Sequence, residues 1–117
     1  MAGSDLRVVT ETGPGGVVVI RVHGGLDGWS GCSELSDVLV VAAGNSAGRT
    51  VVDLSGVGFA DSAGLHALLR GLRAHGETGA LLMLAGPLSA GVHRLFEVTG
   101  TLGAFRFVKD VEAAFTP

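Results

Sequence analysis

Apolar and polar positions alternate along the chain with two periodicities. Short apolar runs rich in β-branched residues are typical of strands that other elements cover. Longer segments with apolar residues at i, i+3, i+4 and i+7, such as Leu65, Leu68, Leu69 and Leu72, predict helices with one buried face. The two patterns predict strands at Leu6–Glu11, Val17–His23, Thr50–Leu54, Ala80–Ala85 and Ala104–Val108, and helices at Trp29–Ala43, Ser62–His75, Ser89–Thr99 and Val111–Phe115.

The order of these elements, β-β-α-β-α-β-α-β-α, predicts one α/β domain over residues 1–117 with its core at about 6–115. The glycine-rich turn Gly13–Gly16 indicates an antiparallel hairpin between the first two strands. Strands that alternate with helices are usually parallel. We therefore expect a mixed, mostly parallel five-stranded sheet with about four helices, and the apolar runs Val51–Leu54 and Leu81–Leu84 in its central strands.

The joint between the third strand and the second helix carries a candidate functional hydroxyl. Ser62 follows Asp61 where the strand Val51–Leu54 has ended and the helix begins. Open α/β folds place their sites at the carboxyl ends of strands, beside helix N-termini. Two interpretations stay open here: Asp61 and Ser62 are a helix cap, or the Ser62 hydroxyl is exposed to a kinase or partner. A helix N-terminus tolerates the charge of a phosphate, so phosphorylation would change docking rather than unfold the domain.

Composition and charge narrow the class of protein. Apolar residues make up 47% of the chain and charged residues 16%, which indicates a packed globular core. The net charge of −3 and the scattered basic residues give no reason to expect a nucleic-acid partner. No signal peptide is visible at Met1–Asp5, and the apolar runs are far shorter than the ~20 residues of a membrane helix. We expect a cytoplasmic protein without membrane insertion.

The one cysteine, Cys32, excludes an internal disulfide and fits a reducing compartment. Two roles are open to it. A cysteine early in a helix can have a lowered pKa and act as a redox switch. The interpretation that we favour is a small, half-buried helix residue.

Catalytic motifs are missing from the sequence. No two of the four histidines, His23, His66, His75 and His93, have metal-ligand spacing. The surroundings of Ser62 are not the Gly-x-Ser-x-Gly nucleophile elbow, and no phosphate-binding glycine loop lies between a strand and a helix. The chain is therefore expected not to be an enzyme and to have no cofactor, metal or catalytic residue.

Three segments carry a resemblance to a known family. Asp61-Ser62-Ala63-Gly64-Leu65, directly after a buried strand, resembles the signature of the STAS domain, the fold of sulfate transporters and anti-sigma factor antagonists. Gly24-Gly25-Leu26-Asp27 resembles the family's Gly-Glu-Leu-Asp motif, with Gly25 in the place of the glutamate. Val92–Gly100 resembles the third helix of bacterial anti-sigma factor antagonists. The resemblance spans roughly Val8 to Phe115.

The resemblance implies a partner-switching function in transcription regulation. It implies that the unphosphorylated chain binds an anti-sigma factor that is also a serine kinase, which releases the sigma factor. Phosphorylation of Ser62 breaks the complex, and a PP2C-type phosphatase resets it; ATP and magnesium belong to the kinase. Ala63 replaces a second hydroxyl that many relatives carry. The implied partner-binding residues are Asp27, Asp61, Ser62, Ala63, Gly64, Leu65 and His66, with Asp61 in a positioning role.

Two other functions remain open within the family. Small STAS proteins also serve as accessory subunits of lipid-transport ATPase complexes, where a similar motif faces an ATPase and need not be phosphorylated. A nucleotide-binding STAS protein ranks last, because the chain supplies no phosphate loop. Trp29 is either a core anchor or an exposed partner contact, and the chain is expected to be a monomer or weak dimer.

Overall fold

A five-stranded sheet forms the centre of the protein, whose computed structural model describes residues 6–45 and 48–115. In space as in sequence, its strands follow the order β1 (Arg7–Thr12), β2 (Val18–Leu26), β3 (Arg49–Ala60), β4 (Leu81–Ala85) and β5 (Arg106–Val108). β1 and β2 are antiparallel across the 3-10 turn η1 (Pro14–Gly16), and all other neighbours are parallel. The predicted mixed sheet, with β3 at its centre, is confirmed.

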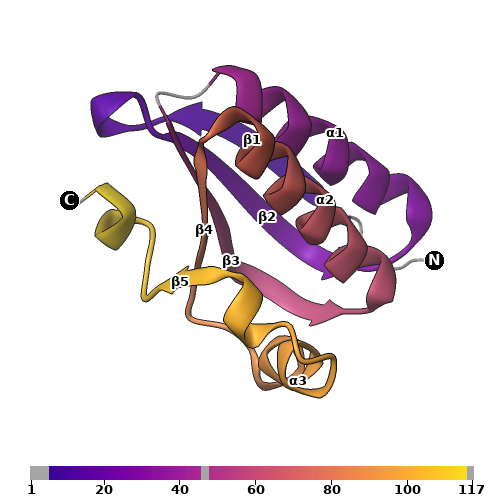
Figure 1. Cartoon of the computed structure of the whole chain (residues 1–117). Coiled ribbons are helices and arrows are strands. Elements are labelled where there is room, and N and C mark those ends of the chain that lie inside the picture. The colour runs from indigo at the N-terminus through magenta and orange to yellow at the C-terminus, as the bar shows by residue number, and fades with distance from the viewer. Residues whose placement is uncertain (1–5, 46–47, 116–117) are drawn as a thin grey trace.

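Three α-helices pack on one face of this sheet. They are α1 (Trp29–Asn45), α2 (Ser62–Thr78) and α3 (Ala90–Val98), and α1 and α2 lie side by side (Figure 1). Successive strand residues point to opposite faces, so Val52 joins the helix-covered core and Val51 does not. Within the described residues, no helix is long and apolar enough to cross a membrane.

The other face of the sheet is covered in part by the C-terminal end of the chain. Val111 and Ala114 lie in a second, smaller apolar cluster with Val19, Val51 and Met83. The segment predicted as a fourth helix is the 3-10 turn η3 (Glu112–Phe115), yellow in Figure 1. The prediction of a helix was wrong because the segment is too short to form more than one turn, which Asp110 caps at the Ala113 N–H (2.9 Å).

The strand β3 is longer than its apolar run predicts. It was predicted to end at Leu54 but continues to Ala60. The reason is that β2 continues to Leu26 and pairs with this additional part of β3. β2 was predicted to end at His23, but Gly24 and Gly25 continue it and form an irregularity within the pairing, where Gly24 adopts a φ of 101°. Only glycine adopts this conformation readily, and a bulge of this kind bends a strand without ending it.

The helix α2 also continues past its predicted end. Gly76 was expected to end it, but the left-handed residue is Gly79, with a φ of 76°. The hydroxyl of Thr78 donates to the Ala43 carbonyl of α1 at 2.9 Å, so a contact with the neighbouring helix supports the additional turn. Gly44 does not end α1, which runs to Asn45.

An ion pair between a buried aspartate and a half-exposed arginine lies on the partly open face of the sheet. Asp53, 8% exposed, accepts from the Arg21 guanidinium at 2.9 Å and from both the N–H and the hydroxyl of Ser55. Arg21 also contacts Glu11 of β1 at 3.3 Å. Both carboxylate oxygens of Asp53 therefore have a donor, which offsets part of the cost of removing its charge from water.

His75 is a fully buried polar residue between α2 and β3. Its Nδ1 lies 2.8 Å from the Gly71 carbonyl and its Nε2 lies 2.8 Å from the Thr50 hydroxyl. The neutral ring satisfies both, with Nδ1–H donating to the carbonyl and Nε2 accepting from the hydroxyl. Burial lowers the pKa of His75 below its ordinary 6.5, and the hydrogen bond to Gly71 opposes that shift only in part.

Acid should therefore destabilise the fold through His75. Below pH 6.5 the unfolded chain binds a proton at this ring that the folded chain does not, so the free energy of unfolding falls as the pH drops. The slope is at most about 1.4 kcal/mol per pH unit. Urea unfolding between pH 8 and 5.5, approximately the range in which histidine titrates, should show this slope in the wild type and in a His66→Gln control. A His75→Gln variant with an unchanged slope would contradict this origin.

Candidate functional site

The candidate site lies where β3 passes directly into α2. Ala60 ends the strand, Asp61 follows, and Ser62 is the first residue of the helix. The Asp61 carboxylate is the N-cap: its Oδ1 accepts from the N–H groups of Ala63 at 2.9 Å and Gly64 at 3.4 Å. The Asp61 N–H donates to the Leu26 carbonyl at the end of β2, at 3.2 Å.

The hydroxyl of Ser62 is left without a structural role. Its side chain is exposed, and it makes no hydrogen bond to any residue in the described part of the chain. Of the two interpretations left open by the sequence, the helix cap therefore applies to Asp61 alone, and Ser62 takes no part in it. Within residues 6–45 and 48–115 no histidine donates to or accepts from Ser62, so the geometry contains no nucleophilic triad.

Three of the predicted partner-binding residues lie in the core beneath this hydroxyl. Ala63 and Leu65 are 5% and 7% exposed, and Gly64 is buried against the end of β2. A Cβ atom on Gly64 would lie 2.6 Å from Leu26 Cγ and closer still to the Leu26 carbonyl, which is backbone and cannot give way. These residues therefore shape the site from below and present little surface to a partner.

Asp61 is half-buried, and the other predicted residues that reach the surface are Asp27, Ser62 and His66. Asp27 is half-buried in the short connection between β2 and α1, and His66 is exposed one helical turn after Ser62. The hydrogen bond from the Asp61 N–H to the carbonyl of Leu26, the residue before Asp27, brings the two aspartates to the same end of the sheet, and both lie near Cys32. Its pKa is raised above 9.0, first by burial and then by the negative charges of Asp61 and Asp27. The chain thus brings together two acidic residues, far apart in sequence, beside the exposed hydroxyl.

A small hollow between α1 and α2 adjoins the site, with a volume of about 230 Å³. Ala63 and His66 line it from α2 together with Arg70, while Ser33 and Ser36 line it from α1. The Ser36 hydroxyl is 4% exposed and has no hydrogen-bond partner among the described residues. Sequence reasoning did not identify Ser33, Ser36 or Arg70, because only the packing of two helices places them next to Ser62.

Phe59 is a second residue that sequence reasoning missed. It is 55% exposed near the end of β3, three residues before Ser62. Strand alternation predicts that Phe59 faces the same side as Val57 and is buried with it. The register shift opposite Gly24 and Gly25 breaks this alternation and leaves the ring in solvent. An exposed aromatic ring beside a polar site is a common anchor for protein partners.

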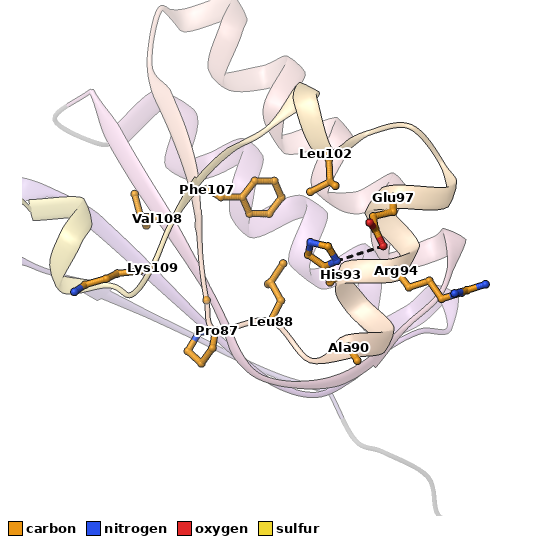
Figure 2. A pocket seen from close by; sticks show the side chains of 11 residues that line it. Pro87, Leu88, Ala90, His93, Arg94, Glu97, Leu102, Phe107, Val108 and Lys109 are labelled. Atoms are coloured by element: carbon orange, nitrogen blue, oxygen red, sulfur yellow. Dashed lines mark ion pairs between the residues drawn. The ribbon is translucent and has the colours of Figure 1, made fainter.

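A larger hollow lies beside α3, near the ends of β4 and β5. Figure 2 shows Leu88, His93 and Phe107 converging on it, while Arg94 and Lys109 extend to opposite sides. Its polar wall is the segment Val92–Gly100 that resembles the third helix of anti-sigma factor antagonists. His93 and Glu97 contact each other at 3.5 Å, but both are half-exposed, so the pair stabilises little. None of the predicted site residues lines this hollow.

Other chemical sites are not found in the described part of the chain. No group of three or more histidine, cysteine or acidic side chains is placed to hold a metal ion there. Cys32 is 3% exposed with a raised pKa, so the alternative of a low-pKa redox cysteine is wrong. The side chain of Trp29, for which two roles were open, lies outside the described residues.

Comparison with protein families identifies the fold. A family model described as "Mlab, STAS domain" matches residues 9–106. The chain therefore belongs to the STAS family, as the motif around Ser62 indicates. No curated protein matches the sequence.

Solved structures of the same fold include anti-sigma factor antagonists. One from Mycobacterium paratuberculosis is 27% identical, with a TM-score of 0.75, and the match covers 94% of this chain and 91% of that one. SpoIIAA in its unphosphorylated form is 19% identical with a TM-score of 0.70, and the match covers 91% of both chains. The Bacillus protein SpoIIAA in its phosphorylated form is 20% identical with a TM-score of 0.69, over 92% of this chain and 96% of that one.

The cap at Asp61 can be tested by its contribution to stability. Asp61→Ala removes the acceptor for two N–H groups, and we expect it to lower the free energy of unfolding by about 1 kcal/mol. Asp61→Asn keeps an acceptor of similar capping strength and should lose less. Urea denaturation of the two variants beside the wild type measures the difference. Equal losses for alanine and asparagine would show that the charge, and not the cap, is what the fold requires.

The reactivity of Cys32 gives an independent test of the packing beside the site. Because the thiol is buried with a raised pKa, we expect iodoacetamide to modify it slowly at neutral pH and faster only above pH 9.0. The matched control is a Cys32→Ala, Ser33→Cys double variant, which moves the thiol one residue to an exposed position. Alkylation followed by mass spectrometry should label the control first. Equal labelling rates would contradict the buried position of Cys32.

Proposed function

We propose that this STAS protein is an anti-sigma factor antagonist switched by phosphorylation of Ser62. In its unphosphorylated form it binds an anti-sigma factor that is a serine kinase, and so releases the sigma factor. A PP2C-type phosphatase removes the phosphate from Ser62 and so restores the unphosphorylated, binding form. The observation that carries the proposal is the Ser62 hydroxyl, exposed on the first turn of α2 while Asp61 alone caps the helix.

The electrostatics around Ser62 support a switch that acts on binding. A phosphate adds about −1.5 to −2 charges at neutral pH. Asp61 and Asp27 already make this surface acidic, and both raise the pKa of the nearby Cys32. The helix N-terminus tolerates the added charge within the domain. A docked partner would have to bury a dianion beside two carboxylates, which is costly without paired cations.

The proposed contact surface consists of the accessible residues at this end of the molecule: half-buried Asp27 and Asp61, and exposed Phe59, Ser62 and His66. Phe59 offers an apolar anchor beside the phosphorylated position, and buried Ala63, Gly64 and Leu65 hold the surface in shape. We propose no catalytic activity and no cofactor for the chain, because phosphate transfer uses the ATP and magnesium of the kinase. The proposed partners place it in the cytoplasm.

The names of the related structures agree with the proposal. The 27% identical structure is described as an anti-sigma factor antagonist. SpoIIAA is described both as such an antagonist in its unphosphorylated form and in a phosphorylated form. A fold of this kind therefore accommodates a phosphate in at least one relative.

Phosphorylation at a single hydroxyl is the direct test. Incubation with ATP, magnesium and each candidate anti-sigma factor kinase should place one phosphate on Ser62, located by mass spectrometry. Ser62→Ala should take up none, while Ser33→Ala, a neighbouring exposed serine, should be phosphorylated like the wild type. Calorimetry should show that Ser62→Asp weakens kinase binding tenfold or more, about 1.4 kcal/mol, because it adds a third carboxylate. A phosphate elsewhere, or unweakened binding by Ser62→Asp, would disprove the proposal.

The second candidate is the accessory subunit of a lipid-transport ATPase complex. The observation that favours it is the matching family model, whose description names Mlab. In this case the same surface would face an ATPase, and Ser62 would serve as a contact without phosphorylation. Co-purification of the tagged chain with a membrane ATPase, unaffected by a phosphatase treatment, would favour this candidate over the soluble kinase.

A further inference from the structure

The strand β1 is an edge of the sheet with no strand on its outer side among the described residues. Five of its six residues are exposed, and Val8 is the exception. Its outer backbone groups are therefore available to a further strand. Natural proteins commonly protect such an edge with proline or with charged side chains, above all lysine. The sequence of β1, Arg-Val-Val-Thr-Glu-Thr, contains no proline or lysine, and its two charges have opposite signs.

The charges of β1 are complementary to those of a second, antiparallel β1. Arg7, Val9 and Glu11 point to one face of the sheet, because strand side chains alternate. Pairing Val9 with Val9 of the second copy places Arg7 opposite Glu11, and Glu11 opposite Arg7. Opposite charges at directly facing positions stabilise a strand pair, whereas like charges destabilise it.

Other registers lack this complementarity. A shift by one residue would place the helices of the two copies on opposite faces of the joined sheet. A shift by two residues keeps the faces matched, but it places Glu11 opposite Val9 or leaves it without a strand partner. The register centred on Val9 is thus the one that pairs both charges and keeps α1 of each copy on the same side.

Apolar surface accompanies the edge on both faces of the sheet. Val9 is 48% exposed on the face that the helices leave open. On the helix face, a groove of about 420 Å³ follows the border of β1 and α1, lined by Thr10, Thr12, Val38 and Val41. Val41 is 60% exposed. A second copy at this edge would cover Val9 and border the groove, which gives the pairing an apolar component beside its backbone hydrogen bonds.

We propose that two copies of this chain associate through β1, antiparallel and centred on Val9, to form one continuous ten-stranded sheet. The contact is isologous, so each copy offers Arg7 to Glu11 of the other. Glu11 already contacts Arg21 of β2 at 3.3 Å and would lie between two guanidinium groups in the dimer. The interface is small, which predicts a dimer that dissociates on dilution. The proposed dimer uses the β1 edge of the sheet, two strands away from β3, and does not depend on phosphorylation of Ser62.

Charge exchange tests the proposal. Sedimentation velocity over a concentration series should show the wild type approaching twice its monomer mass. Arg7→Glu and Glu11→Arg should each remain monomeric, because each places like charges opposite one another. The double variant, Arg7→Glu with Glu11→Arg, should dimerise again, since every pair is restored with its signs exchanged. Single variants that dimerise like the wild type, or a double variant that does not recover, would overturn the proposal.

Two further variants separate loss of the interface from loss of the fold. Val9→Lys places two ammonium groups together at the centre of the contact and should abolish the dimer, while Val98→Lys alters a similarly exposed valine on α3 and should not. Urea unfolding identifies any variant that is destabilised, and such a variant is not counted. Hydrogen exchange of the wild type should slow in β1 as the concentration rises. A wild type that stays monomeric throughout, or protection confined to another surface, would equally reject the pairing.

Discussion

The Asp61 carboxylate is the contact on which the arrangement at this end of the molecule depends. Its side chain caps α2, and its backbone N–H holds the end of β2, so a single residue aligns a strand and a helix that the chain would otherwise join only through β3. The cap also determines what Ser62 can do. A helix needs acceptors for its first N–H groups, and Asp61 supplies one, so the serine hydroxyl is not needed for the cap.

Close backbone approach is the second constraint, and glycine makes it possible. Gly64 lies against Leu26, and Gly71 lies against Leu39 of α1, where a Cβ would come within 2.6 Å of Leu39 Cδ1. The leucine pattern predicted that α2 exists and which face it buries, but Leu69 and Leu72 are only partly buried. Small residues carry much of the contact instead. A pattern of large apolar residues does not show where glycine and alanine make close contacts. The sequence therefore did not predict the hollow beside Ser62.

The order of strands and helices follows from local signals, which predict it correctly up to the C-terminal turn η3, whereas the role of Ser62 stays a prediction. Periodicity distinguishes strands from helices, and the family motif places Ser62 at a helix start. The length of β3 and the exposure of Phe59 depend instead on a partner strand. Gly24 and Gly25 are typical of a chain break when read alone, yet pairing with residues of β3 such as Phe59 keeps them within β2. Tertiary pairing overrides local propensity at such positions, and no single-sequence pattern contains that information.

A switch at Ser62 requires a domain that does not itself change. The residues beneath the hydroxyl are buried and tightly packed, and the helix N-terminus favours an anion, so a phosphate would meet little resistance from the fold. Its effect would fall on the surface, where two carboxylates already lie close by and His66 is exposed one turn away. Rigidity and acidity thus have complementary consequences. Rigidity would keep a phosphorylated chain folded, and acidity would make the added charge decisive for whatever binds there.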